Sequence, residues 1–350
     1  MTRSSAAAAA LVTGALLASP DLCMPTHAQP VVNIGARLHA AAEYSRAHGG
    51  DVLLVVSEDA VIFEDYRRAA EPGAVYPLGT ATIGFVCAAA AAAFDDQLLR
   101  RDQSAADVLP ELGEDQARRT ITIDHLIRQT SGLASGGEAL NRPSLGDRQL
   151  HALRLPLTAS PGARFDPGPS HTAVFAEALR RVLAKSNQNV ATWLERRVFS
   201  QIGLRGLIWR RDVAGNPVLD DGAALPAREW AKFGVVMKTL GMWEATRVLG
   251  ANHVRSCLQG SAAMPLYGVG WWLNSAPPTN ADAAQLPFML DGPEGALYAD
   301  APRDMAVAAG VDGQRLYVVP SLDLVIVRLG RADAGWRDRA FLARLLYGRG

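Results

Sequence analysis

A side-chain hydroxyl stands at the start of a predicted helix without a proton acceptor beside it. Residues 78–85 read Leu-Gly-Thr-Ala-Thr-Ile-Gly-Phe and open an apolar helix. Thr80 supplies the hydroxyl, whereas Ile83, one turn later on the same face, supplies only hydrocarbon. A free hydroxyl is a weak nucleophile, and general-base help contributes about 10² to 10⁴ in rate. Thr80 is therefore a hydroxyl that its neighbour on this helix face does not activate.

Other reactive side chains are sparse or scattered. The three lysines are Lys185, Lys232 and Lys238, against 32 arginines, a ratio that indicates a compositional bias. We therefore give weight to Ile83 and not to the scarcity of lysine as such. The seven histidines include no pair at i and i+4. We expect neither a metal nor another cofactor.

The charge balance argues against two classes of partner. Lysine plus arginine and aspartate plus glutamate number 35 each, so no long-range field gathers nucleic acid or anionic lipid. The helical run that follows residue 85 is too short to span a bilayer. We expect no nucleic-acid partner and no transmembrane segment after removal of the N-terminal segment.

That N-terminal segment is typical of a secretory signal peptide over residues 1–28. Arg3 precedes an apolar run at 6–18, and Thr26-His27-Ala28 would place the cleavage before Gln29. An unprocessed alanine-rich tail is the alternative. We predict a periplasmic or secreted protein.

Cleavage would remove Cys23, whose preceding residues are a poor lipoprotein signal, and leave Cys87 and Cys257. An oxidising compartment allows these two to form one disulfide. Two isolated buried thiols are the alternative that we favour from the sequence.

Strand patterns lie at both ends of the chain and helical patterns lie between them. Two apolar runs around residues 57–59 predict a hairpin, and two β-rich runs flank Pro320-Ser321. We expect residues 52–67 and 315–329 to share one antiparallel sheet. Helical spacing or apolar content predicts helices at 85–94, 121–127, 175–183, 190–199, 228–240 and 336–347.

Several blocks along residues 52–346 resemble the serine β-lactamase and penicillin-binding-protein superfamily, in particular the class C β-lactamase-like hydrolases. The blocks are residues 76–80, 121–133, 161–165, 227–234, 267–272 and 313–320. The resemblance implies an α/β (α+β) fold in which an antiparallel sheet built from both termini is flanked by helices. It implies a sheet lobe at 29–77 and 262–350, and an inserted helical lobe at 78–261.

The resemblance also assigns motif positions that this chain has changed. The family's Ser-x-x-Lys signature falls on Thr80 and Ile83, so both its nucleophile and its base differ. Its Tyr-x-Asn motif falls on Pro167 and Pro169, and no tyrosine lies anywhere between Tyr76 and Tyr267. The proton-shuttling phenol is therefore lost whatever the alignment.

The third family motif, Lys-Thr-Gly or His-x-Gly, falls on residues 308–310. Ala308 replaces the cationic or imidazole side chain, while Gly310 keeps the close backbone approach. The resemblance implies that the backbone amides of Thr80 and Val311 form a two-donor oxyanion site, because such donors do not depend on side-chain identity. We expect Ile83, Pro167 and Pro169 to line a less polar cleft around Thr80.

Three functions remain open at this stage. The one that we favour is a catalytically silent protein that keeps the cleft for a small-molecule or peptide-like ligand. A second is an esterase or amidase in which His171, or a distant carboxylate, serves Thr80 as a substitute base. In that case His171 would not be the capping or packing residue usual at a helix start. A third is a structural protein that acts through its outer surface.

Overall fold

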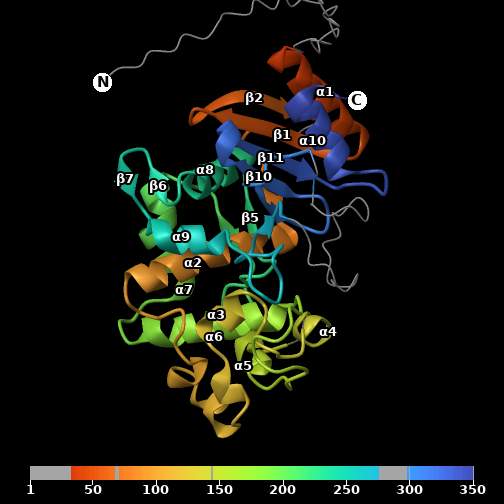
Figure 1. Cartoon of the computed structure of the whole chain (residues 1–350). Coiled ribbons are helices and arrows are strands. Elements are labelled where there is room, and N and C mark those ends of the chain that lie inside the picture. The colour runs from red at the N-terminus through yellow and green to blue at the C-terminus, as the bar shows by residue number, and fades with distance from the viewer. Residues whose placement is uncertain (1–32, 68–70, 143–144, 276–297, 299, 350) are drawn as a thin grey trace, which may run out of the picture. The chain divides into compact units, whose positions relative to one another are not determined.

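The structure is a computed structural model, and it describes residues 33–67, 71–142, 145–275, 298 and 300–349. The predicted signal peptide and Cys23 lie outside these residues. The division into a sheet lobe and a helical lobe stays a prediction. Figure 1 shows helices α1 and α10 beside the main sheet and helices α3 to α6 away from it.

The main sheet is built from both ends of the described chain. Its six antiparallel strands follow the order β2-β1-β11-β10-β9-β8. Strand β1 pairs with β11 from Gly50↔Gly330 to Ser57↔Leu324, which confirms the predicted sheet. The strands are β1 (Gly50–Ser57), β2 (Ala60–Tyr66), β8 (Trp272–Leu273), β9 (Ala306–Ala309), β10 (Arg315–Val319) and β11 (Leu324–Gly330).

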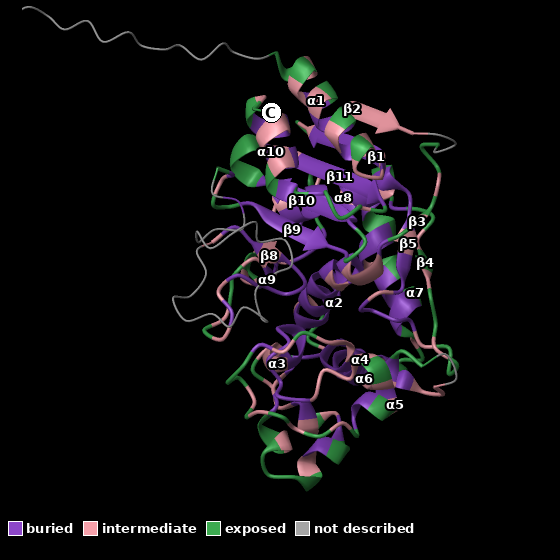
Figure 2. Cartoon of the chain, turned by 90° about the vertical axis from the view of Figure 1, so that its right-hand side faces the viewer, coloured by how far each residue is buried: buried purple, intermediate pink, exposed green. Residues whose placement is uncertain are grey.

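Both faces of this sheet are buried, because alternate side chains of a strand point to opposite faces. Val52 and Leu54 of β1 join the larger core with residues of α2 and α8. Leu53 and Val55 join a second core with residues of α1 and α10. Figure 2 shows the buried strands between these helices.

Helices occupy every range that the sequence predicts, with ends shifted by a few residues. Helix α2 is buried from Gly84 to Phe94, as expected of a run that is apolar on every side. The sequence patterns gave no indication of α1. The helices are α1 (Ile34–Ala47), α2 (Gly84–Asp95), α3 (Ile123–Ile127), α4 (Gly137–Leu140), α5 (Arg148–Ala152), α6 (Pro169–Ala184), α7 (Val190–Leu194), α8 (Ala227–Lys238), α9 (Ala251–Cys257) and α10 (Asp338–Tyr347).

Short elements complete the described fold. A 3-10 turn, η1 (Gly79–Ile83), leads into α2. A π-turn, Glu195–Phe199, extends α7. Two small sheets hold β3 (Tyr76–Pro77), β5 (Ala223–Leu225) and β4 (Ile208–Trp209), and β6 (Met242–Trp243) and β7 (Thr246–Arg247).

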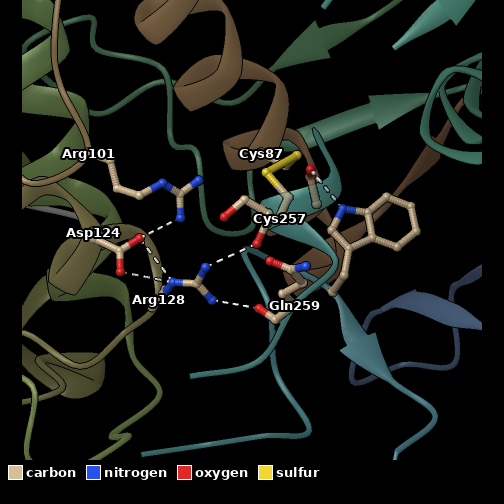
Figure 3. Close-up of a disulfide and its surroundings, with 9 residues drawn as sticks. Cys87, Arg101, Asp124, Arg128, Cys257 and Gln259 are labelled. Atoms are coloured by element: carbon tan, nitrogen blue, oxygen red, sulfur yellow. Dashed lines mark hydrogen bonds and ion pairs between the residues drawn. A yellow bond between two sulfur atoms is a disulfide. The ribbon is translucent and has the colours of Figure 1, made fainter. Parts of the chain in front are cut away.

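The two cysteines of the described chain form a disulfide, so the expectation of two isolated thiols was wrong. Cys87 of α2 and Cys257 of α9 are bonded, with their Cα atoms 5.8 Å apart (Figure 3). This Cα separation suits a disulfide, and it arises because α2 packs against α9. Sequence gives no such distance across 170 residues.

Candidate functional site

Thr80 lies in the turn η1, and its hydroxyl bonds to the backbone at the end of β9. The Oγ1 atom donates to the carbonyl of Ala309 at 3.5 Å and accepts from the N–H of Val311 at 3.3 Å. These are the hydrogen bonds of this hydroxyl in the described part of the chain. Neither of these partners, a backbone carbonyl and a backbone N–H, is a titratable group.

Ile83 contributes to the core and not to proton transfer. Its half-buried side chain packs against the large core, and the residue ends η1 where α2 begins. Gly84 then allows a close approach of the sheet, because a Cβ there would lie 3.1 Å from that of Ala308. The first turn of α2 is therefore positioned by hydrocarbon packing.

The strand that carries the third motif lies against this turn. Ala308 is fully buried in the large core, on the sheet face that covers α2. A Cβ on Gly310 would lie 2.6 Å from the carbonyl of Leu78, so the backbone comes as close as the sequence indicates. The structure brings Thr80 and Val311 together. Their oxyanion role stays a prediction.

The second motif opens α6, and its two prolines suit that position. Pro169 is the first residue of α6, where a proline loses no helical hydrogen bond, and Pro167 precedes it on an exposed segment. Gln129 fixes this segment, since its Oε1 accepts from the N–H of Gly168 at 3.0 Å. That both prolines line a cleft around Thr80 stays a prediction.

His171 sits in the first turn of α6, and both of its ring nitrogens are engaged there. Nε2 lies 2.7 Å from the carbonyl of Asp166, and Nδ1 lies 2.8 Å from Oγ of Ser131. A carbonyl only accepts, so we assign the proton to Nε2, and the Ser131 hydroxyl donates to Nδ1. Burial lowers the pKa of His171 to about 4, although the Asp166 carbonyl opposes this shift. To serve Thr80, His171 would have to give up these contacts.

Gln129 and Tyr267 were not assigned to the site from the motifs. Gln129 connects the segment before α6 to Tyr267. Gln129 donates from Nε2 to the phenol oxygen of Tyr267 at 2.8 Å, and both side chains are buried. Tyr267 also contacts the rings of Phe165 and Trp272. The positive φ of 58° at Gln129, unusual for a residue other than glycine, marks this position in the structure. The sequence places both Gln129 and Tyr267 within blocks that resemble the family, but it gives no sign that their side chains meet.

Two of the three lysines make hydrogen bonds and ion pairs with groups other than Thr80. Nζ of Lys232 bonds to Glu229 and to the carbonyl of Gly203, and Nζ of Lys238 bonds to Asp59 and Asp323. Lys185 is exposed at the end of α6.

His125 and Trp271 have local structural roles. The N–H of Thr122 donates to Nδ1 of His125 at 3.2 Å, and the N–H of His125 donates to Oγ1 of Thr122 at 3.1 Å. This reciprocal pair caps α3. Trp271 is fully buried and packs in the core.

Two further observations concern the described residues as a whole. No group of three or more histidine, cysteine, aspartate or glutamate side chains among them is placed to hold a metal ion. Nor does that part of the chain contain a helix with the length and apolar character needed to cross a membrane.

This arrangement is the fold of the β-lactamase and penicillin-binding-protein type of serine hydrolase. The chain belongs to the Beta-lactamase family, whose model matches residues 36–346. No curated protein matches the sequence.

Solved structures share the fold at low sequence identity. A putative β-lactamase from Bacteroides dorei is 15% identical with a TM-score of 0.66, over 85% of this chain and 90% of that one. A putative 6-aminohexanoate-dimer hydrolase from Bacillus anthracis is 16% identical with a TM-score of 0.67, over 88% and 80%. A D-stereospecific amidohydrolase from Streptomyces is 14% identical with a TM-score of 0.64, over 91% and 100%.

Proposed function

We propose that this protein is an exported, catalytically silent member of the Beta-lactamase family that binds a small-molecule or peptide-like ligand at Thr80. One observation carries the proposal: among the residues that the structure describes, the Thr80 hydroxyl bonds to backbone atoms of Ala309 and Val311 and to no base. An alkoxide forms at neutral pH only when a neighbouring group takes the proton. The hydroxyl is therefore a hydrogen-bonding group and not a nucleophile.

The chemistry that remains suits a neutral carbonyl group. The N–H of Val311 now donates to Thr80, and a ligand carbonyl that displaced this hydroxyl would receive the same hydrogen bond. Lys232 and Lys238 are paired with carboxylates, so neither is available to attract an anionic ligand. An amide or ester carbonyl within an uncharged part of the ligand is the class that fits.

Export is supported by the disulfide and by the signal-like N-terminus. Bonds such as Cys87–Cys257 persist in oxidising compartments and are rare where thiols are kept reduced. This supports the periplasm or the extracellular space as the location.

The second candidate is a hydrolase in which Thr80 reacts. Its support is that the Thr80 hydroxyl and a backbone donor are close together, in a family whose fold is shared with amide hydrolases. It requires a base, and His171 would serve only after it released Ser131 and Asp166. The geometry therefore favours the silent protein.

A comparison of wild type with Thr80→Ala separates the two functions. We expect equally negligible labelling by a fluorophosphonate probe and equally slow turnover of a simple ester. Thr246→Ala, which removes an exposed hydroxyl on β7, is the matched control. Loss of a measurable activity in Thr80→Ala alone would show that Thr80 is a working nucleophile.

Binding needs its own measurement. On titration with N-acetylated amino acid amides, we expect the backbone amide signal of Val311 to shift in a nitrogen-edited NMR spectrum. A signal that stays fixed at millimolar concentrations of these amides would argue against ligand binding at Thr80 and in favour of a structural role.

A further inference from the structure

Helices α2 and α9 are joined at two places. At one end, the Asp95 carboxylate of α2 accepts from the N–H of Gly250, just before α9, at 2.8 Å. At the other end, Cys87 and Cys257 form the disulfide shown in Figure 3. The two cysteines are 0% and 1% exposed. One connection is thus a hydrogen bond, and the other is covalent and buried.

Beyond the disulfide, the chain returns to the first turn of α2. The N–H of Val269 donates to the carbonyl of Cys257 at 2.8 Å. Two residues later, Nε1 of Trp271 donates to the carbonyl of Gly84 at 3.3 Å. The segment 257–271 therefore lies between the disulfide and the start of α2.

The contact with the Thr80 turn itself is close. Gly270 has φ +76°, and a Cβ there would lie 2.1 Å from the carbonyl of Ile83. Ile83 ends the turn η1 that carries Thr80. The position of the segment 257–271 thus bears directly on the geometry at Thr80.

A second, non-covalent clamp holds the end of α9 to a different helix. Arg128 donates to the carbonyls of Gln259 at 2.6 Å and Ser256 at 3.0 Å, and Asp124 of α3 holds the Arg128 side chain at 3.0 Å (Figure 3). This clamp fixes α9 relative to α3. The covalent link between the last turn of α9 and α2 is the disulfide.

We propose that the Cys87–Cys257 bond holds residues 257–271 in position against α2. The Thr80 site therefore takes its described geometry in the oxidised chain and becomes less ordered in the reduced chain. The bond forms when two thiols are oxidised by a low-molecular-weight disulfide, R–S–S–R, which leaves as two R–SH molecules. Electrons and protons balance in this exchange. The inference holds whether Thr80 is silent or reactive.

Because both cysteines are buried, the Cys87–Cys257 bond forms during folding and is not reversibly reduced in the folded protein. A thiolate must reach a sulfur atom to exchange with it, and both sulfur atoms belong to buried residues. The bond must therefore form before α2 and α9 close, and it is protected afterwards. We expect dithiothreitol without denaturant to leave the bond intact in folded wild type. Rapid reduction under these conditions would show that the bond is a reversible switch and would contradict this part of the proposal.

Hydrogen exchange of the full chain tests the positioning role. Two forms that lack the bond are compared with oxidised wild type: the Cys87→Ala, Cys257→Ala double variant, and wild type refolded and kept in dithiothreitol. We expect the amides of residues 257–271, that of Val269 above all, to exchange at least about tenfold faster in both forms. Amides of β1 and β11, which exchange through global unfolding, should be accelerated by a smaller factor than those of residues 257–271.

Three results would overturn the proposal. Unchanged exchange at Val269 in both forms would show that Arg128 and packing suffice. Equal acceleration in β1 and β11 would show general destabilisation. If neither form folds while oxidised wild type does, the bond is required by the whole unit and not by this segment.

A labelling experiment gives an independent readout. In Cys87→Ala, the thiol of Cys257 is left free, and its alkylation by iodoacetamide under native conditions should outpace global unfolding. A Cys257 thiol that reacts only as fast as the protein unfolds would contradict the proposal.

Discussion

The hydroxyl of Thr80 accepts a hydrogen bond from the backbone N–H of Val311, across 231 positions of sequence, at 3.3 Å. The bond joins the turn before α2 to the turn that follows β9. It occupies the donor that the family resemblance assigns to a developing oxyanion. In this chain the donor binds the Thr80 hydroxyl, whose other partner among the described residues is the carbonyl of Ala309.

Restoring only the first motif should not restore full activity. In Thr80→Ser with Ile83→Lys, the nucleophile and its base return, but Pro167 still stands where the family places its proton-shuttling tyrosine. We expect kcat/KM for a simple ester to stay about 10² to 10⁴ below that of an active relative, the range that general acid–base catalysis contributes. Thr80→Ser alone is the control. Parity with an active relative assayed alongside would show that the phenol is dispensable.

Acid should destabilise the protein through His171. Its pKa is about 4 in the folded chain and about 6.5 when unfolded, so the unfolded state binds more protons between these values. The contribution of His171 to the free energy of unfolding should therefore be constant well above pH 6.5 and fall by up to about 3 kcal/mol as the pH drops to 4.

Urea unfolding of wild type and His171→Gln at pH 7 and pH 4.5 measures this contribution. The pKa of His125 is also lowered, mainly by burial, so only the difference between the two proteins reports on His171. An identical loss of stability in both proteins would assign the effect to other groups.

A methyl group at Gly270 should be costly. Gly270→Ala combines a left-handed backbone with a Cβ placed 2.1 Å from the Ile83 carbonyl, and we expect a loss of about 2 to 5 kcal/mol. Gly215→Ala is the matched control, because Gly215 has φ +87° with nothing within 4 Å of the added atom. Its loss should be about 1 to 2 kcal/mol. Equal thermal shifts in the two variants would show that the contact at Ile83 relaxes without cost.

Loss of the disulfide should lower global stability as well as loosen its segment. The bond closes a loop across 170 positions, and removal of such a native bond costs about 2 to 5 kcal/mol. Denaturant midpoints of oxidised wild type and of the Cys87→Ala, Cys257→Ala variant measure this. A difference below about 0.5 kcal/mol would mean that the unbonded chain is held equally well by packing.

The sequence by itself determined the kinds of side chain available and the periodic elements. The spacing of apolar residues located α2, α8 and both hairpins. This spacing is a local property of the sequence, and it distinguishes a helix buried on all sides, such as α2, from one buried on one face, such as α8. Replacement of the family's lysine by Ile83, and the absence of tyrosine between Tyr76 and Tyr267, are likewise facts of sequence. These two facts hold whatever three-dimensional structure the chain adopts.

Only the tertiary structure decided which distant groups meet. The Cys87–Cys257 bond, the hydrogen bond of His171 to Ser131 and that of Gln129 to Tyr267 join positions 40 to 170 residues apart. Each depends on distances of a few ångströms that arise when helices and loops pack together, and no local pattern encodes such distances. The hydroxyl of Thr80 was visible in the sequence, but its bond to Val311 exists because the two ends of the chain close one sheet beside α2.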